Sequence, residues 1–208
     1  MKTINSINRN LIYISAGDRE VFASYAINNL VDYFDVGIFY YGEDQKKIEK
    51  LAESASFFTV GKGTKFNSFK LLTQDTPEIF DRYDTIWLCD DDLIVVKGDL
   101  RAAPKILKKY NLKILSPAYS VWGRMSHNIM RPHLWNRVFR FVNFVEMGSP
   151  LFDSQALKSF LNVYDGSLDG QGIDWWYCNF MKCDSELVAG IVDSIVFKNP
   201  YERDKSDS

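Results

Sequence analysis

Short apolar runs alternate with amphipathic segments along the first half of the chain, and this alternation restricts the fold more than any other feature. The apolar runs, which have the length of buried strands, cover residues 11–16, 36–41, 57–60, 85–89 and 113–115. Helical spacing occupies residues 44–53 and 65–74 and also follows Asp18 and Asp99, which are suited to cap their helices. Strands that alternate with helices predict an α/β fold with a largely parallel sheet. Pro117 is expected to end the fifth strand.

The second half of the chain is less regular. Its expected elements are an extended segment at 141–147, a helix at 153–161, a glycine-rich loop at 165–172, a helix at 173–182 and one or two strands within 187–197. The charged residues 201–208 are expected to form a disordered tail. No repeat or linker divides the chain, so residues 1–200 are expected to form a single domain.

The composition excludes several classes of function. The 208 residues carry a formal charge of −2, which argues against a nucleic-acid-binding protein. The three cysteines fit neither a disulfide framework nor the spacing of a zinc site, and they indicate a reducing compartment. No apolar run approaches the ~20 residues of a membrane span, and residues 1–5 lack the apolar stretch of a signal peptide. We therefore expect a cytoplasmic protein with at most peripheral membrane contact.

Three consecutive aspartates, Asp90, Asp91 and Asp92, follow the fourth apolar run. Neighbouring carboxylates repel one another unless a cation or hydrogen-bond donors offset their charge. Side chains alternate across an extended segment, so Asp90 and Asp92 are expected on one face and Asp91 on the other. Two hard oxygen ligands on one face suit Mg²⁺ or Mn²⁺ when the phosphates of a nucleotide complete the shell. The sequence favours a metal-dependent enzyme acting on a phosphate-bearing substrate, with a solvated turn as the alternative.

A second polar loop is expected at the same edge of the sheet. Ser15, Gly17 and Asp18 follow the first apolar run or end it. The carboxyl ends of parallel strands meet at one rim, and ligands of such sheets bind there. The two loops therefore predict one site.

The segment Tyr83-Asp84-x-Ile86-Trp87-Leu88-x-Asp90-Asp91-Asp92 resembles the nucleotide-sugar-binding strand of GT-A glycosyltransferases, which carries an Asp-x-Asp motif. More narrowly, the chain resembles a family of proposed bacterial and plant glycosyltransferases that was first catalogued as a domain of unknown function. The matching segments, in the order of the family, are residues 13–18, 40–42, 63–67, 115–118, 140–146 and 170–174. The resemblance covers about residues 10–200.

This resemblance implies a GT-A-like fold, with a nucleotide-sugar-binding half at residues 10–120 and an acceptor-binding half at 121–200. It implies transfer of a sugar from a nucleotide-diphosphate sugar to an acceptor hydroxyl, with Mn²⁺ or Mg²⁺ as cofactor. The acceptor would be a glycan or a lipid-linked glycan, in the synthesis of cell-surface polysaccharides. A Mg²⁺-dependent nucleotidyltransferase or phosphatase is one alternative. A non-catalytic module that binds nucleotide sugars or carbohydrates is another.

The resemblance also assigns roles at the donor site. Asp92 would bind the metal directly, and Asp90 would bind the ribose or a metal-bound water. Asp91, on the other face, would complete the nucleotide site by holding a nearby backbone or basic group. The loop after the first strand would lie near the base and ribose, with Ser15 and Asp18 as hydrogen-bonding groups. Capping of a helix is the structural alternative for Asp18.

Two lysines and an asparagine complete the predicted donor site. Lys65, in a glycine-rich loop, would contact a phosphate, with a solvated loop lysine as the alternative. Many GT-A enzymes supply a metal-binding histidine near the C-terminus, and the matching segment here has none. Asn199 lies where that histidine would fall and offers an amide oxygen to the metal. Lys198, beside it, could contact phosphate.

Two carboxylates are candidates for the general base. Asp174 follows a glycine-rich loop at the start of a helix. In inverting GT-A enzymes a carboxylate near such a loop removes the proton of the acceptor hydroxyl. An ordinary first-turn aspartate, favoured by the helix dipole, is the alternative. Glu146 competes for the same role or binds acceptor hydroxyls, and an ion pair with Arg140 is its structural alternative.

Overall fold

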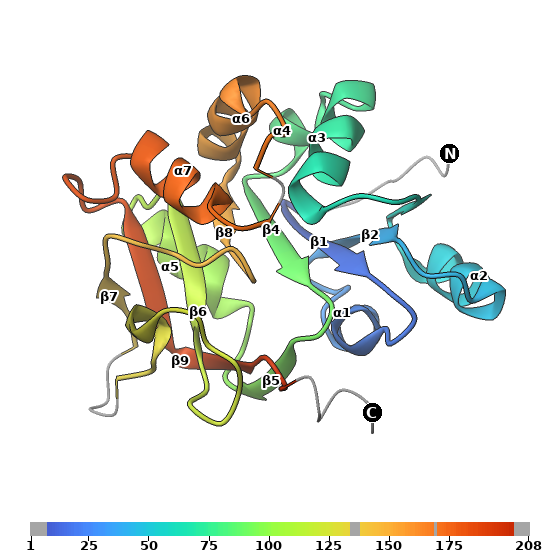
Figure 1. Cartoon of the computed structure of the whole chain (residues 1–208), viewed down its shortest axis with the longest axis horizontal. Coiled ribbons are helices and arrows are strands. Elements are labelled where there is room, and N and C mark those ends of the chain that lie inside the picture. Colours follow the sequence, from blue (N-terminus) through green and yellow to red (C-terminus); the bar gives the residue numbers. More distant parts are fainter. Residues whose placement is uncertain (1–7, 134–137, 169, 202–208) are drawn as a thin grey trace.

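The structure is a computed structural model of the chain and describes residues 8–133, 138–168 and 170–201 (Figure 1). Its strands are β1 (Asn10–Ala16), β2 (Asp35–Tyr40), β3 (Phe57–Val60), β4 (Thr85–Asp90), β5 (Ile94–Lys97), β6 (Ile114–Tyr119), β7 (Arg140–Phe141), β8 (Leu151–Asp153) and β9 (Ala189–Lys198). Its helices are α1 (Val21–Asn29), α2 (Gln45–Ser54), α3 (Lys65–Asp75), α4 (Ile79–Arg82), α5 (Ala102–Lys109), α6 (Ser154–Val163) and α7 (Ile173–Phe180), with a 3₁₀ turn at Asn128–Met130. Within the described residues, no helix is both long and apolar enough to cross a membrane.

The strands join in one mixed sheet, in the order β3-β2-β1-β4-β8-β6-β9-β5, with β7 paired to β9. The first four strands of that order are parallel, and so are β6 and β9. The other pairs are antiparallel. The predicted parallel arrangement therefore holds for β1 to β4 and for β6 with β9, whereas β5, β7 and β8 pair antiparallel and make the sheet mixed. The segment before β8 runs antiparallel to β4, and the backbone oxygens of Pro150 and Gly148 accept hydrogen bonds from N–H groups of β4. An antiparallel neighbour needs no helical crossover.

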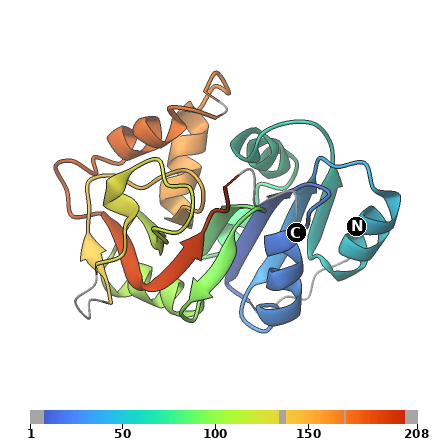
Figure 2. The ribbon, with the colours of Figure 1, turned by 60° about the horizontal axis from the view of Figure 1, so that its bottom comes forward.

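Helices cover both faces of the sheet (Figures 1 and 2). Side chains of α1, α2 and α5 pack into one core, and those of α3, α4, α6 and α7 pack into the other. Because side chains alternate along a strand, β1 supplies Ile12 and Ile14 to the first core and Leu11 and Tyr13 to the second. The sequence prediction of an α/β fold is confirmed.

Most elements lie within a helical turn of where the sequence placed them, whereas α4, β5 and β8 were not expected. β5 was not expected, because it directly follows the aspartates and is a largely exposed edge strand rather than a buried one. Of the extended segment expected at 141–147, only Phe141 belongs to a strand. The tail expected at 201–208 lies, beyond Tyr201, outside the described residues.

The fifth predicted strand does not end at Pro117. β6 continues through it to Tyr119. Its parallel register with β9 shifts at this point, from Pro117 opposite Val192 to Ala118 opposite Val196. A proline lacks the N–H that a regular ladder uses, and the irregular register accommodates it. The expectation of a strand end at this residue is therefore wrong.

The two predicted aspartate caps have different outcomes. α1 begins after Glu20, which has a left-handed backbone with φ of 46° and no capping side-chain hydrogen bond, so Asp18 does not cap this helix. Asp99 accepts a hydrogen bond from the backbone N–H of Arg101 at 3.0 Å. It therefore stabilises the turn that leads into α5, but the N-cap of that helix is Arg101, so Asp99 does not cap the helix itself.

Gly98, in the turn between β5 and α5, provides a test of this packing. Its φ of +94° favours glycine, and a Cβ there would lie 2.2 Å from the backbone oxygen of Ser194. We expect Gly98→Ala to lower the free energy of unfolding, measured by urea denaturation, by about 1–3 kcal/mol. Gly170→Ala is the control, because a Cβ there meets no atom of the described residues within 4 Å apart from its chain neighbours. Equal losses in the two variants would contradict the expectation.

Candidate functional site

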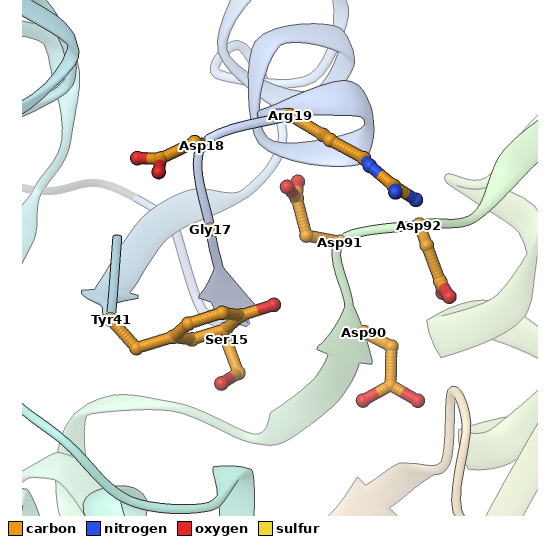
Figure 3. A pocket seen from close by; sticks show the side chains of 8 residues that line it. All are labelled: Ser15, Gly17, Asp18, Arg19, Tyr41, Asp90, Asp91 and Asp92. Atoms are coloured by element: carbon orange, nitrogen blue, oxygen red, sulfur yellow. The ribbon is translucent and has the colours of Figure 1, made fainter. Parts of the chain in front are cut away.

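The carboxyl ends of β1 and β4 meet at one rim of the sheet. The two strands are parallel neighbours, and their register places Ser15 opposite Asp90. A cavity of about 410 Å³ opens at this rim (Figure 3). The residues that line it are Ser15, Gly17, Asp18, Arg19, Tyr41, Asp90, Asp91 and Asp92. The structure thus brings together the two loops that the sequence placed at a common edge.

The three aspartates divide between two faces, as their alternation predicted. Figure 3 shows Asp91 pointing toward α1, while Asp90 and Asp92 point to the other side. Asp91 is 5% exposed, and its Oδ1 accepts a hydrogen bond from the N–H of Ala23 at 2.8 Å. Burial raises the pKa of Asp91 to about 6, against the opposing effect of the α1 backbone donors. Asp91 therefore anchors the first turn of α1 and leaves the other face to its two neighbours.

Lys65 is buried and bonded to Asp90. Its Nζ lies 2.8 Å from Asp90 Oδ1, 2.6 Å from the backbone oxygen of Met147 and 3.1 Å from that of Gly148. Its side chain is 3% exposed, so the alternative of a solvated loop lysine is wrong. An ammonium has three N–H donors, and these three acceptors match them. Lys65 therefore joins Asp90 to the segment that crosses the end of β4.

Gly17 and Asp18 shape the cavity wall in different ways. A Cβ on Gly17 would lie 2.8 Å from Cε2 of Tyr41, so the glycine lets this ring lie across the loop. Asp18 Oδ1 accepts hydrogen bonds from the Tyr40 hydroxyl at 2.6 Å and from two backbone N–H groups just before α2. These donors, the hydroxyl first, hold the pKa of Asp18 below its ordinary value. Asp18 thus ties the loop after β1 to the loop after β2.

Arg19 and Tyr41 also line the cavity, and neither was among the predicted site residues. Figure 3 shows Arg19 extending from the loop after β1 toward the aspartate segment, and the Tyr41 ring pointing into the cavity. Burial, followed by the charges of the aspartates, raises the pKa of the Tyr41 hydroxyl. Tyr41 could have been found, because it follows β2, which is parallel to β1 and ends at the same rim. The sequence did not indicate Arg19 as a site residue, apart from its position directly after Asp18.

Glu146 lies between the aspartate rim and α7. Ser126 is a hydrogen-bond partner of its carboxylate, and the charges of His127, Asp174 and Asp90 are near enough to influence its pKa. Burial is the largest influence and raises that pKa above its ordinary value. Glu146 Oε2 is buried and has no hydrogen-bond partner in the part of the chain that the structure describes. Glu146 is therefore a partly desolvated carboxylate close to the aspartate rim.

Asp174 lies in the first turn of α7 and is 6% exposed. Its Oδ1 accepts a hydrogen bond from the N–H of Trp175 at 3.0 Å, which is a contact available to an aspartate at a helix start.

Arg140 pairs with Asp193, and the Nε of Arg140 lies 3.2 Å from Oδ2 of Asp193. The alternative that made Glu146 the ion-pair partner of Arg140 is therefore wrong.

The end of β9 returns to the aspartate rim. β9 and β5 are antiparallel with Lys198 opposite Ile94, so Asn199 comes beside Leu93, which directly follows Asp92. Asn199 Oδ1 is buried and has no hydrogen-bond partner among the described residues. Lys198 is half-buried and lies outside the set of residues that line the cavity.

The oxygen atoms at this rim suit a hard divalent cation that a bound phosphate helps to hold. In the described ranges, no group of three or more His, Cys, Asp or Glu side chains is arranged to hold a metal by itself. The candidate oxygens are those of Asp90 and Asp92 and the buried Oδ1 of Asn199. Mg²⁺ in nucleotide sites is commonly bound through one or two carboxylates and the phosphates of the substrate. This donor set fits that pattern.

No family model and no curated protein matches the sequence. Among solved structures, GalNAc-T7 with UDP, GalNAc and Mn²⁺ matches with a TM-score of 0.65 at 9% identity, over 92% of this chain and 43% of that chain. S. aureus TarS 1-349 in complex with UDP matches with a TM-score of 0.65 at 10% identity, over 95% of this chain and 62% of that chain. The chain thus spans less than two thirds of the length of either protein.

Identities this low show the fold alone, and that fold is of the GT-A type. The GT-A-like architecture expected from the sequence is therefore confirmed. The resemblance to the narrower family, and the roles of the individual site residues, stay predictions.

Lys65→Met tests the bond that joins α3 to the rim. The variant leaves Asp90 and two backbone oxygens without their ammonium donor, so we expect the free energy of unfolding to fall by roughly 1–3 kcal/mol. Urea denaturation measures the change. Lys62→Met, in the same glycine-rich loop, is the matched control, because the Lys62 side chain is 73% exposed and its ion pair with Glu43 is a surface pair. A loss in Lys65→Met no larger than in the control would contradict the assigned role.

Proposed function

We propose that the protein is a glycosyltransferase that moves a sugar from a nucleotide-diphosphate sugar to an acceptor hydroxyl. The observation that carries the proposal is the acidic cavity at the carboxyl ends of β1 and β4. Ligands of open α/β sheets bind at this edge. The solved GalNAc-T7 and TarS structures, which share the fold, contain UDP, and that of GalNAc-T7 also contains GalNAc and Mn²⁺.

The donor would lie across the rim, between the loops after β1 and β4. Tyr41 and Ser15 suit a base and ribose, because the ring offers a stacking surface and the hydroxyl offers a hydrogen bond. Arg19 extends toward the aspartates, where its guanidinium suits the diphosphate. Lys65 acts indirectly, because its N–H donors are matched by Asp90 and two backbone oxygens. Lys198 remains a candidate for a phosphate contact from the end of β9.

Asp92 and Asn199, with Asp90 beside them, would hold Mn²⁺ or Mg²⁺. When bound, such a cation offsets the negative charge that develops on the diphosphate leaving group. Lys65 keeps the Asp90 carboxylate in a fixed orientation for contact with the ribose or with water. Asp91 contributes by fixing the start of α1, and with it the loop that carries Arg19.

Glu146 is the better placed of the two candidate bases. Burial raises its pKa, and a general base is most effective when its pKa approaches the working pH. Its Oε2 has no partner in the described chain, whereas Oδ1 of Asp174 is engaged by the N–H of Trp175. Asp174 acts on Glu146 through its charge, which raises the pKa of Glu146 further. Removal of the acceptor proton by one carboxylate implies inversion at the anomeric carbon.

Asp92→Ala tests the donor site. A ligand that binds the native state raises its stability by RT ln(1 + [L]/Kd), which is roughly 2.7 kcal/mol at a hundredfold excess over Kd. We expect at least one of UDP, GDP, ADP, CDP and TDP to raise the Tm of the wild type when Mn²⁺ is present, and a chelator to reduce the shift. Asp92→Ala should lose the part of the Tm increase that depends on Mn²⁺. Glu49→Ala, an exposed acidic position on α2, is the control. A shift in Asp92→Ala equal to that of the control would exclude Asp92 as a ligand.

Glu146→Gln tests the general base. The active form of a base is its carboxylate, and burial raises the Glu146 pKa, so transfer in the wild type should rise with pH above the ordinary glutamate value near 4.5 and then level off. We expect the glutamine variant to lose this dependence and to transfer about 10²–10⁴-fold more slowly, with unchanged nucleotide binding. Asp174→Asn, which keeps an oxygen for the Trp175 N–H, should lose less transfer activity than Glu146→Gln. The reverse order of losses would make Asp174 the base.

Hydrolysis of the donor without an acceptor separates the enzyme from a binding module. Without an acceptor, water can take the place of the acceptor hydroxyl in a transferase, so nucleoside diphosphate should accumulate slowly from the correct nucleotide sugar. Release of pyrophosphate instead would indicate nucleotidyl transfer. Nucleotide binding without any turnover would identify a non-catalytic module.

A further inference from the structure

A second cavity lies beyond Glu146, against α7. Its volume is about 580 Å³, and its walls come from α7 and from the segment that precedes Glu146. Phe144, two residues before Glu146, and Trp175, next to Asp174, both line it. Glu146 and Asp174 do not line the cavity themselves, but each lies within two residues of a side chain that does.

Trp175 provides an exposed but fixed aromatic surface in this cavity. Its side chain is among the most exposed aromatic groups of the described chain, at 62%. The Trp175 ring centroid lies 4.7 Å from that of Phe144 and 6.1 Å from that of His127, and the His127 and Phe144 rings are 4.5 Å apart. The two neighbouring rings limit the orientations of the indole while leaving most of it in solvent. Such a ring is a preformed stacking surface.

Polar side chains surround this ring. Asn143, Asn179 and Asp184 are exposed and line the same cavity, so their amide and carboxylate groups are open to a ligand. Asn143 and Asp184 also line an adjoining cavity of about 530 Å³ that continues past Phe141 and Leu187. Each cavity alone has the volume of a ligand site, about 300–1,000 Å³. Together they form a groove that leads away from Glu146.

We infer that this groove binds the acceptor and that the acceptor is a carbohydrate chain of at least two units, with one sugar ring on Trp175. The inference rests on the proposed function, because it places the receiving hydroxyl at Glu146. A sugar ring has apolar C–H faces and a rim of hydroxyls, so it pairs with an aromatic surface that has hydrogen-bonding groups around it. A lipid tail would instead leave the amides and the carboxylate buried without partners. A single sugar at Glu146 would leave the adjoining cavity empty.

Saccharide binding by Trp175→Ala tests the inference. The probes are free mono-, di- and tetrasaccharides of glucose, galactose, mannose and N-acetylglucosamine, titrated calorimetrically into the intact chain with UDP and Mn²⁺ present. We expect one series to bind the wild type more tightly as its length increases. Trp175→Ala should weaken the binding at least tenfold, and Trp175→Phe should restore part of it. Trp122→Ala is the matched control, because Trp122 is 79% exposed and lies outside both cavities. The affinity of this variant for the saccharides should equal that of the wild type.

Three results would overturn the inference: no binding of any probe to the wild type, equal affinity for mono- and tetrasaccharides, or wild-type affinity in Trp175→Ala. Far-UV circular dichroism of each variant checks the fold. Donor hydrolysis without acceptor, measured on the same proteins, separates this inference from the proposed function. The wild type and Trp122→Ala should hydrolyse the donor at equal rates, because Trp122 lines neither cavity. If the wild type hydrolyses the donor and Trp175→Ala binds the saccharides with unaltered affinity, the inference alone is overturned. A wild type that binds no nucleotide and hydrolyses no donor overturns the proposed function.

Discussion

The bond between the Lys65 ammonium and Asp90 is the contact on which the candidate site depends. It joins the first residue of α3 to the last residue of β4, and through the backbone oxygens of Met147 and Gly148 it also joins both to the segment before β8. A buried ammonium is tolerated only when its charge and its donors are satisfied, so these partners cannot move independently. The rim is therefore fixed in shape before any ligand arrives.

The repulsion among the three aspartates is resolved largely within the protein. Lys65 compensates Asp90, and the backbone N–H groups at the start of α1 compensate Asp91. Asp92 faces the cavity that Arg19 also enters (Figure 3). A divalent cation is therefore not required to hold the acidic segment together. Its proposed place follows instead from the hard oxygens near Asp92, including the amide oxygen of Asn199 at the end of β9.

The sequence was informative where local pattern decides the structure. Apolar runs and helical spacing predicted the strands and helices of the first half except α4 and β5, and the expected parallel arrangement of β1 and β4 predicted the shared rim. Features that depend on distant partners gave no local signal. The three-residue β8 pairs with strands that lie far away in sequence, and the buried partners of Lys65 and Arg140 are Met147 and Asp193, 82 and 53 residues distant. No periodicity encodes such a pairing, so the local rules that place helices and strands cannot place these contacts.

One segment connects the rim to the groove. Residues 143–148 supply Asn143 and Phe144 to the groove, Glu146 to the space between, and two backbone oxygens to Lys65. The segment is also held from the other side, because the Tyr177 hydroxyl of α7 donates to the backbone oxygen of Val145 at 2.7 Å. The backbone on both sides of Glu146 is thus held by hydrogen bonds, which fix the position from which its side chain extends. The burial that raises its pKa is therefore a property of the fold, and a carboxylate held in this way suits the removal of a proton from a hydroxyl delivered along the groove.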